Sequence, residues 1–336
     1  MIYLGYHRSV RDIVRAAIQE DVQAIGISSY NGGHIEFFTE VLKLLKLKGA
    51  RHIHVFGGGG GTITPADARE LKQRGVDEIF SAGTPLQDMV EFVESNYSRP
   101  FAKATRPPIN SWLSDLEISR LLTAAGNSGL FKVRMVASQT RVIGITGPGG
   151  AGKTTLIDEL TLRFLEGKPQ GRLAILSHDP SLHGRGALLG DRATMVYAQH
   201  DRVFMRSLAT RGSAGGLSRA TKGCVQVLKQ AGFDLVLVES AGIGQENLPF
   251  ARGLVDMQVL VMSPDYGSRL QLQKIAMLEA ADVVVINKTD MPAARTAFAE
   301  LEQRVALNRK QPVLIATTAK QHKDPGVSEL FRLLNA

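Results

Sequence analysis

A glycine-rich stretch, GPGGAGKTT, has residue types suited to holding phosphate groups. Its spacing matches the pattern GxxxxGK[ST], in which small residues let successive backbone amides converge on phosphate oxygens. A helix that begins directly after the loop would add a partial positive charge. Lys153 is expected to reach the outer phosphates, and the Thr154 hydroxyl to bind Mg²⁺. The predicted nucleotide-binding residues here are Gly147, Pro148, Gly149, Gly150, Ala151, Gly152, Lys153, Thr154 and Thr155.

A second motif indicates which base is bound. Asn287, Lys288, Thr289 and Asp290 directly follow the apolar stretch DVVVI. The Asp290 carboxylate can accept from both the ring N–H and the exocyclic amine of guanine, whereas adenine lacks this donor pair, so discrimination could reach about 10⁴. A further loop with Ala319 and Lys320 follows PVLIA and is of the type that covers guanine. These residues predict that GTP is preferred over ATP.

Carboxylates that follow strand-like stretches are candidates for a metal site and for hydrolysis. Asp179 follows RLAILS, Asp191 follows a glycine, and Glu239 ends DLVLVE. Oxygen ligands suit Mg²⁺, which needs only one or two direct protein ligands, although Asp179 or Asp191 could instead cap a helix or loop. Lys153, Asp191 and Glu239 are the predicted catalytic residues.

The Gly242 amide, three residues after Glu239, is expected to contact the γ-phosphate. Many Ras-like GTPases have glutamine directly after this glycine, but Ile243 stands here and the first glutamine is Gln245. We therefore expect unassisted GTP hydrolysis to be slow.

These motifs lie at the ends of alternating strand-like and helix-like segments over residues 141–336, which is typical of a parallel sheet covered by helices. Residues 1–94 show the same alternation, with four strand-like stretches, IYLG, AIGIS, HIHVFGGGGG and EIFSAG. A flavodoxin-like sheet has five strands in the order 2-1-3-4-5. IYLG would then be the second strand of a truncated sheet whose first strand is missing.

The two series are separated by NYSRPFAKATRPPINS, a polar, proline-containing stretch without periodicity, and by a predicted helix that starts near Ser111 and ends near Gly126. We therefore expect a truncated domain at 1–94, a linker and helix at 95–140, and a P-loop GTPase domain with a mostly parallel sheet at 141–336.

Composition narrows the function classes. The 336 residues are 44% apolar, and no apolar run approaches the roughly 20 residues of a membrane helix. One cysteine and no recognisable signal peptide favour the cytoplasm. The net charge of +8 is spread through a chain with only 6% aromatic residues, so nucleic acid is not an expected partner.

The motifs GPGGAGKTT, ILSHDPS, GALLGDR, VESAGIGQ and NKTD resemble the G-protein chaperones of cobalamin-dependent acyl-CoA mutases, the methylmalonyl-CoA mutase chaperone family. YLGYH, GISSYNGGH, FGGGG and FSAGTP resemble the cobalamin-binding domain of the same mutases. Their order resembles the N-terminal half of fused isobutyryl-CoA mutases. The resemblance implies a GTP-binding and hydrolysing chaperone module that controls cofactor loading or protection, with a mutase domain or subunit as partner; it leaves a homodimer open.

The resemblance also assigns residues. It implies a Mg²⁺ site at Thr154, His178 (through its carbonyl), Asp179, Asp191, Glu239 and Ser240, and contacts of Ser28, Gly57 and Gly58 with the nucleotide tail of cobalamin. Without the resemblance, the two glycines would be read as an ordinary turn. The family's Asp-x-His-x-x-Gly motif, which supplies the histidine ligand of cobalt, is absent, and so is the catalytic barrel. This chain alone is therefore not expected to isomerise an acyl-CoA.

Two other classes of function stay open. A nickel-insertion GTPase or a small-molecule kinase could use the same scaffold, but eight scattered histidines and one cysteine form no nickel-binding run, and a kinase would require ATP. The other alternative is a non-enzymatic fragment that only binds nucleotide.

Overall fold

The computed structural model describes residues 1–98, 113–128, 139–180, 190–242, 248–266, 276–307 and 310–335. These residues form two compact units, one of residues 6–98 and 113–120 and the other of residues 1–5 and those from 121 onward. The division falls inside α5 (Asp115–Ser128). Both units contain helices around a parallel sheet, which confirms the predicted α/β class.

The smaller unit has three parallel strands in the order β1-β2-β3. Its elements are α1 (Val10–Gln19), β1 (Ala24–Ser28), α2 (His34–Leu47), β2 (His54–Gly58), α3 (Pro65–Arg74), β3 (Glu78–Phe80) and α4 (Leu86–Tyr97). The core packs Phe38, Val41 and Leu45 of α2 against Ile25, Ile27 and Val55 of the sheet.

The prediction that IYLG forms a strand of this sheet is wrong. Residue 2 makes only an isolated bridge, and residues 1–5 belong to the larger unit. In the order 2-1-3-4-5, this stretch would pair only with the strand that precedes it, and no described residue forms that strand. An apolar stretch of strand-forming residues becomes a strand only where a partner offers backbone hydrogen bonds.

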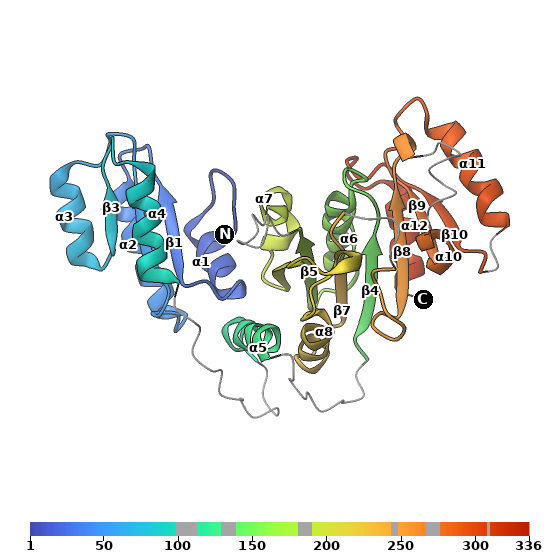
Figure 1. Ribbon diagram of the computed structural model, residues 1–336, viewed down its shortest axis with the longest axis horizontal. Coiled ribbons are helices and arrows are strands. Elements are labelled where there is room, and N and C mark those ends of the chain that lie inside the picture. Colours follow the sequence, from blue (N-terminus) through green and yellow to red (C-terminus); the bar gives the residue numbers. More distant parts are fainter. Residues whose placement is uncertain are drawn as a thin grey trace. The chain divides into compact units, whose positions relative to one another are not determined.

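The larger unit has seven parallel strands in the order β10-β9-β8-β4-β7-β5-β6, most of which can be followed side by side in Figure 1. The strands are β4 (Arg141–Thr146), β5 (Leu173–Asp179), β6 (Val203–Ala209), β7 (Leu235–Glu239), β8 (Met257–Met262), β9 (Val283–Ile286) and β10 (Val313–Ala316). The helices are α6 (Lys153–Gly167), α7 (Asp191–Thr194), η1 (Tyr197–Gln199), η2 (Ala214–Gly216), α8 (Thr221–Gln230), η3 (Pro264–Tyr266), α10 (Ala276–Ala280), α11 (Ala294–Ala306) and α12 (Pro325–Asn335).

Alternate residues of the central strands face opposite sides of this sheet. Val259 and Val283 pack with α6 and α12 on one side, whereas Leu260 and Val284 pack with α10 and α11 on the other. Burial on both faces explains why these strands read as continuous apolar runs. Among the helices that the structure describes, none is long and apolar enough to cross a membrane.

An aspartate directly before β7, β8 and β9 fixes the register of each strand. Asp234, Asp256 and Asp282 each donate a backbone N–H to the neighbouring chain segment, and each side chain accepts an N–H from the same neighbouring residue. The partners are Arg172, Val142 and Gln258, with N···Oδ2 distances of 2.8, 2.7 and 2.7 Å. The carboxylates thereby satisfy backbone groups at the edge where the strands begin.

The strand β6 escaped the sequence analysis because Arg206 and Ser207 interrupt its apolar run. Both side chains are buried, and Arg206 Nη2 donates to Thr123 Oγ1 of α5 at 2.7 Å. The predicted helix of the linker exists as α5, but its cap is Ser114. The Ser114 Oγ accepts the Glu117 amide at 3.3 Å, and the Glu117 carboxylate accepts the Ser114 amide at 2.7 Å. Ser111, the predicted cap, lies outside the described residues.

Candidate functional site

The phosphate loop joins β4 to α6, and the side chain of Lys153 bonds back to the start of the loop. Lys153 Nζ donates to the carbonyl oxygens of Gly147 at 3.0 Å and Pro148 at 3.2 Å. Burial lowers the pKa of Lys153, and the nearby Glu239 and Asp191 carboxylates act in the opposite direction. Gly147 has φ +145°, and a Cβ there would lie 2.0 Å from the Val261 carbonyl oxygen, so the turn admits only glycine.

Four strand or helix ends bring hydroxyl and carboxyl groups together beside this loop. Thr154 Oγ1 donates to Glu239 Oε1 at 3.0 Å, which joins the start of α6 to the end of β7. Ser177 of β5 bonds Asp191 Oδ2 and lies 3.2 Å from Glu239 Oε2. The structure therefore places Thr154, Asp191 and Glu239, which lie far apart in the sequence, in one cluster.

Glu239 is the most perturbed acid of this cluster. Complete burial, reinforced by the Asp191 carboxylate, raises the pKa of Glu239 to about 8, although Lys153, Thr154 and Ser177 act in the opposite direction. An acid with such a pKa holds its proton at neutral pH unless a cation compensates its charge.

The side chains of His178 and Ser240, two other predicted metal residues, bond to protein groups other than the side chains of Thr154, Asp191 and Glu239. The His178 ring bonds the Glu239 carbonyl through Nδ1 at 2.7 Å and Thr221 Oγ1 through Nε2 at 2.8 Å, so both nitrogens are engaged and the ring is not available to a metal. Its burial lowers the pKa of His178 to about 4. Ser240 Oγ donates to Thr146 Oγ1 at 2.8 Å, and Asp179 is the last residue of β5.

Gly242 lies directly against the phosphate loop. Its carbonyl oxygen accepts from the Gly149 amide at 3.0 Å, and a Cβ at Gly242 would lie 2.7 Å from Gly149 Cα. This approach requires glycine at position 242. Ile243 and Gln245, on which the expectation of slow hydrolysis rests, lie outside the described residues.

Asn287 connects the phosphate loop to the two loops that were assigned to the base. Its Nδ2 donates to the Ala151 carbonyl at 3.0 Å, while its Oδ1 accepts from Thr317 Oγ1 at 3.1 Å and from the Ala319 amide at 2.9 Å. Thr289 adds a hydrogen bond to the Thr317 carbonyl oxygen at 3.1 Å. The side chain of Asn287 thus aligns the loops after β9 and β10.

Asp290 is placed at the exposed end of this arrangement. Its carboxylate forms an ion pair with Lys320, which holds the pKa of Asp290 below its usual range. Lys288 adopts φ +60°, a left-handed conformation that turns the chain between Asn287 and Asp290. Asn287, Thr289, Asp290, Ala319 and Lys320 are therefore brought together.

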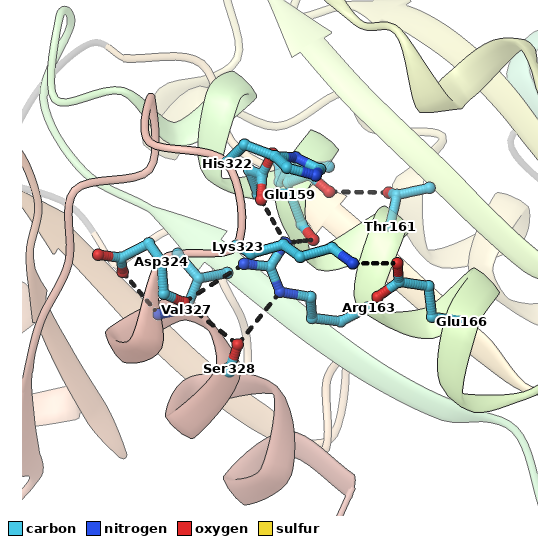
Figure 2. Close-up of polar contacts among 10 residues, drawn as sticks. Glu159, Thr161, Arg163, Glu166, His322, Lys323, Asp324, Val327 and Ser328 are labelled. Carbon is cyan, nitrogen blue, oxygen red and sulfur yellow. Dashed lines mark hydrogen bonds and ion pairs between the residues drawn. The ribbon is translucent and has the colours of Figure 1, made fainter.

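A polar seam between α6 and α12 supports the second base loop (Figure 2). Arg163 is buried, bonds Glu159 on its own helix, and donates to the Asp324 carbonyl and to Ser328 Oγ at 3.3 Å each. Asp324 in turn accepts the Val327 amide at 2.9 Å. The helix that begins at the phosphate loop thus also holds the chain that follows Ala319 and Lys320.

We expect Arg163→Met to lower the free energy of unfolding by about 3–5 kcal/mol, because the change removes the nearer ion-pair partner of the buried Glu159 and leaves it only His322, whose Nδ1 lies 3.6 Å away. The double variant Arg163→Met/Glu159→Gln should recover part of the loss. Urea unfolding of both variants measures the effect, with Lys323→Met, in an exposed ion pair with Glu166, as a control that changes little. A single variant as stable as the control would contradict the expectation.

The sequence analysis did not single out several residues of this site. Ser177 stands inside an otherwise apolar strand, and that polar interruption near the strand end was the one available hint. Thr317 and Arg163 act through partners that are distant in the sequence, so neither could be assigned from spacing.

On the smaller unit, Ser28 ends β1 and is exposed, while Gly57 and Gly58 end β2. A Cβ at Gly57 would lie 2.2 Å from the Ile27 carbonyl oxygen, and one at Gly58 would lie 2.7 Å from that of Phe80. The packing of this sheet therefore already requires both glycines. The structure brings Ser28 and Gly58 side by side in register at the carboxyl ends of β1 and β2.

Comparison with known proteins gives matches over both units. The family model "Methylmalonyl Co-A mutase-associated GTPase MeaB" matches residues 122–333, and the model "B12 binding domain" matches residues 1–89. The fused isobutyryl-CoA mutase of Geobacillus kaustophilus is 39% identical over 98% of this chain and 33% of its own length. That of Cupriavidus metallidurans is 40% identical over 99% of this chain and 32% of its own length.

The chain thus spans about one third of the length of these relatives. Among solved structures, one described as "LAO/AO transport system kinase" has a TM-score of 0.44 and 23% identity, over 66% of this chain and 63% of that one.

Proposed function

The chain belongs to the MeaB family of methylmalonyl-CoA mutase-associated GTPases and carries a B12-binding domain, and on this basis we propose that it is a Mg²⁺-dependent GTPase that serves a cobalamin-dependent acyl-CoA mutase. The resemblance inferred from the motifs is confirmed at the level of the family. The observation that carries the proposal is the joining of phosphate loop, acidic cluster and base loops through Lys153, Thr154 and Asn287.

In this proposal the residues from Gly147 to Thr155 hold the phosphates, and Gly242 contacts the γ-phosphate. Thr154, Asp191 and Glu239 would hold Mg²⁺, with Asp179, Ser240 and the His178 carbonyl around them. A buried carboxyl cluster with raised proton affinity fits a cation, because the cation removes the cost of burying the charged form. When bound, Mg²⁺ supplies charge neutralisation at the phosphates.

We expect Mg²⁺ binding to release about one proton at pH 7, since Glu239 must lose the proton that its pKa of about 8 lets it keep. Affinity for Mg²⁺ should therefore rise with pH until about pH 8. Calorimetric titration in two buffers of different ionisation enthalpy measures the released proton. Glu239→Gln cannot release it and is the control; an equal release from that variant, or none from the wild type, would contradict the assignment.

The raised pKa of Glu239 also makes the stability of the metal-free protein depend on pH. The ordinary glutamate pKa is 4.5 and the folded value is about 8, so the folded state binds the proton more tightly. The resulting stabilisation is present in full below about pH 4.5 and is lost as the pH rises to about 8.

Nucleotide preference tests the central claim. Titrating the full chain with GTP and with ATP should give clearly tighter GTP binding, because Asp290 and its neighbours pair with the donors of guanine. A preference for ATP would overturn the proposal and favour the kinase class. Phosphate release measured with the same samples separates a GTPase from a module that only binds nucleotide.

We propose further that a cobalamin-dependent mutase, of the isobutyryl-CoA type suggested by the relatives, is the partner whose cofactor loading or protection the GTPase controls. Ser28, Gly57 and Gly58 are the residues that this chain offers to the nucleotide tail of cobalamin. Cobalamin supplies the cobalt chemistry of such a mutase when bound. Phosphate release with and without added mutase tests the partnership: acceleration by the mutase is expected, and equal rates would count against it.

A further inference from the structure

The segment of residues 210–216 between β6 and α8 belongs to no motif that the sequence analysis singled out. It has an unusual backbone, with positive φ at Arg211 (49°), Gly212 (73°), Gly215 (80°) and Gly216 (71°). Glycine adopts such a conformation readily, so Arg211 is the one of these four positions where it costs energy and has to be held by the surroundings. The contacts of the segment show what holds it.

Each end of the segment bonds the backbone of the phosphate site. The Thr210 amide donates to the Asp179 carbonyl at 3.0 Å, at the end of β5. The Ala241 amide donates to the Gly216 carbonyl at 2.9 Å, one residue before Gly242. The segment therefore connects the ends of two strands that contribute to the acidic cluster.

The backbone of this segment packs too closely against Ala241 to admit a side chain at Gly216 without a shift. A Cβ at Gly216 would lie 2.8 Å from the Ala241 carbonyl oxygen, and a Cβ at Gly242 would lie 2.7 Å from Gly149 Cα. Gly216, Ala241, Gly242 and Gly149 thus follow one another in close contact, from the segment to the phosphate loop. A displacement at Gly216 has to move Ala241 and Gly242.

We infer that residues 210–216 are a positioning segment, which fixes Ala241 and Gly242 against the phosphate loop and thereby decides how strongly the site distinguishes GTP from GDP. The inference rests on the proposed function, in which Gly242 contacts the γ-phosphate. Because GDP lacks that phosphate, a displaced Gly242 weakens the binding of GTP and leaves the binding of GDP nearly unchanged. A residue that only stabilised the fold would affect both nucleotides alike.

The test compares Gly216→Ala with Gly212→Ala in the full chain. Both glycines have nearly the same φ, so both variants carry the same backbone strain. A Cβ at Gly212, however, meets no heavy atom of the described part of the chain within 4 Å. The measured quantities are the dissociation constants for fluorescent GDP and for a non-hydrolysable GTP analogue, with Mg²⁺ present, together with a thermal melt.

Gly216→Ala should weaken analogue binding about tenfold relative to GDP, within the range usual for coupled sites, whereas Gly212→Ala leaves the ratio unchanged. An unchanged ratio in Gly216→Ala, or an equal change in both variants, would overturn the inference. If Gly216→Ala fails to fold, Gly216→Asn and Gly212→Asn replace the pair, because asparagine tolerates left-handed φ while keeping the Cβ. Wild-type protein that binds neither nucleotide would instead refute the proposed function.

Discussion

Asp290→Asn should lower the affinity for GTP by about 10³- to 10⁴-fold and create a preference for xanthosine triphosphate. The carboxylate offers two acceptors to the ring N–H and the amine of guanine, and an amide replaces one acceptor by a donor. That donor faces the guanine amine but would pair with the carbonyl oxygen that xanthine has at the same position. Competition of GTP, ATP and xanthosine triphosphate for one fluorescent nucleotide measures the change.

The position of Asp290 makes this variant informative about function rather than folding. The side chain is exposed, and its carboxylate forms an exposed ion pair with Lys320, so a melting temperature close to that of the wild type is expected. Asp88→Asn in α4 is the matched control with an unchanged nucleotide profile. If Asp290→Asn still preferred GTP by the wild-type factor, another residue would have to read the base.

Lys153→Met is expected to lower the rate of GTP hydrolysis by about 10²- to 10³-fold, since it removes the donor that would stabilise charge on the outer phosphates. Methionine keeps a flexible apolar stem, so the loss is mainly that of the ammonium group. That group donates to the carbonyl oxygens of Gly147 and Pro148, so it lies at the loop that would hold the phosphates. Single-turnover phosphate release at saturating GTP measures the rate.

A second consequence separates this variant from a simple loss of binding. Lys153 is one of the groups that lower the pKa of Glu239, so its removal should raise that pKa and weaken Mg²⁺ binding near neutral pH. Lys222→Met, an exposed change in α8, is the control and should hydrolyse GTP at the wild-type rate. Hydrolysis by Lys153→Met within threefold of that control would contradict the assigned role.

The two variants test opposite ends of one site. Asp290→Asn should hydrolyse xanthosine triphosphate at close to the wild-type rate for GTP once it is bound, because the base end does not touch the transferred phosphate. Lys153→Met should be slow with every nucleotide. Asn287 bonds the phosphate loop at Ala151 and the loop after β10 at Ala319. Neither variant removes these bonds, so each should affect only its own end of the site.

The sequence by itself determined the parts of this protein whose chemistry is local. Gly147 to Thr155 and Asn287 to Asp290 are contiguous, and each stands at the end of an apolar strand, so residue type and spacing were enough to predict where the structure would put them. The same holds for the parallel α/β architecture, because buried strands and amphipathic helices leave a periodic pattern.

Only the tertiary structure decided which distant groups meet. Ser177 joins Asp191 to Glu239, Arg163 joins α6 to α12, and Gly216 supports Ala241, and none of these pairs is close in the chain. The strand at IYLG was predicted and does not form, while β6, with its buried Arg206, was missed and does. In each case the deciding energy comes from a partner: backbone groups need a neighbouring strand, and a buried charge needs a hydrogen bond from across the fold.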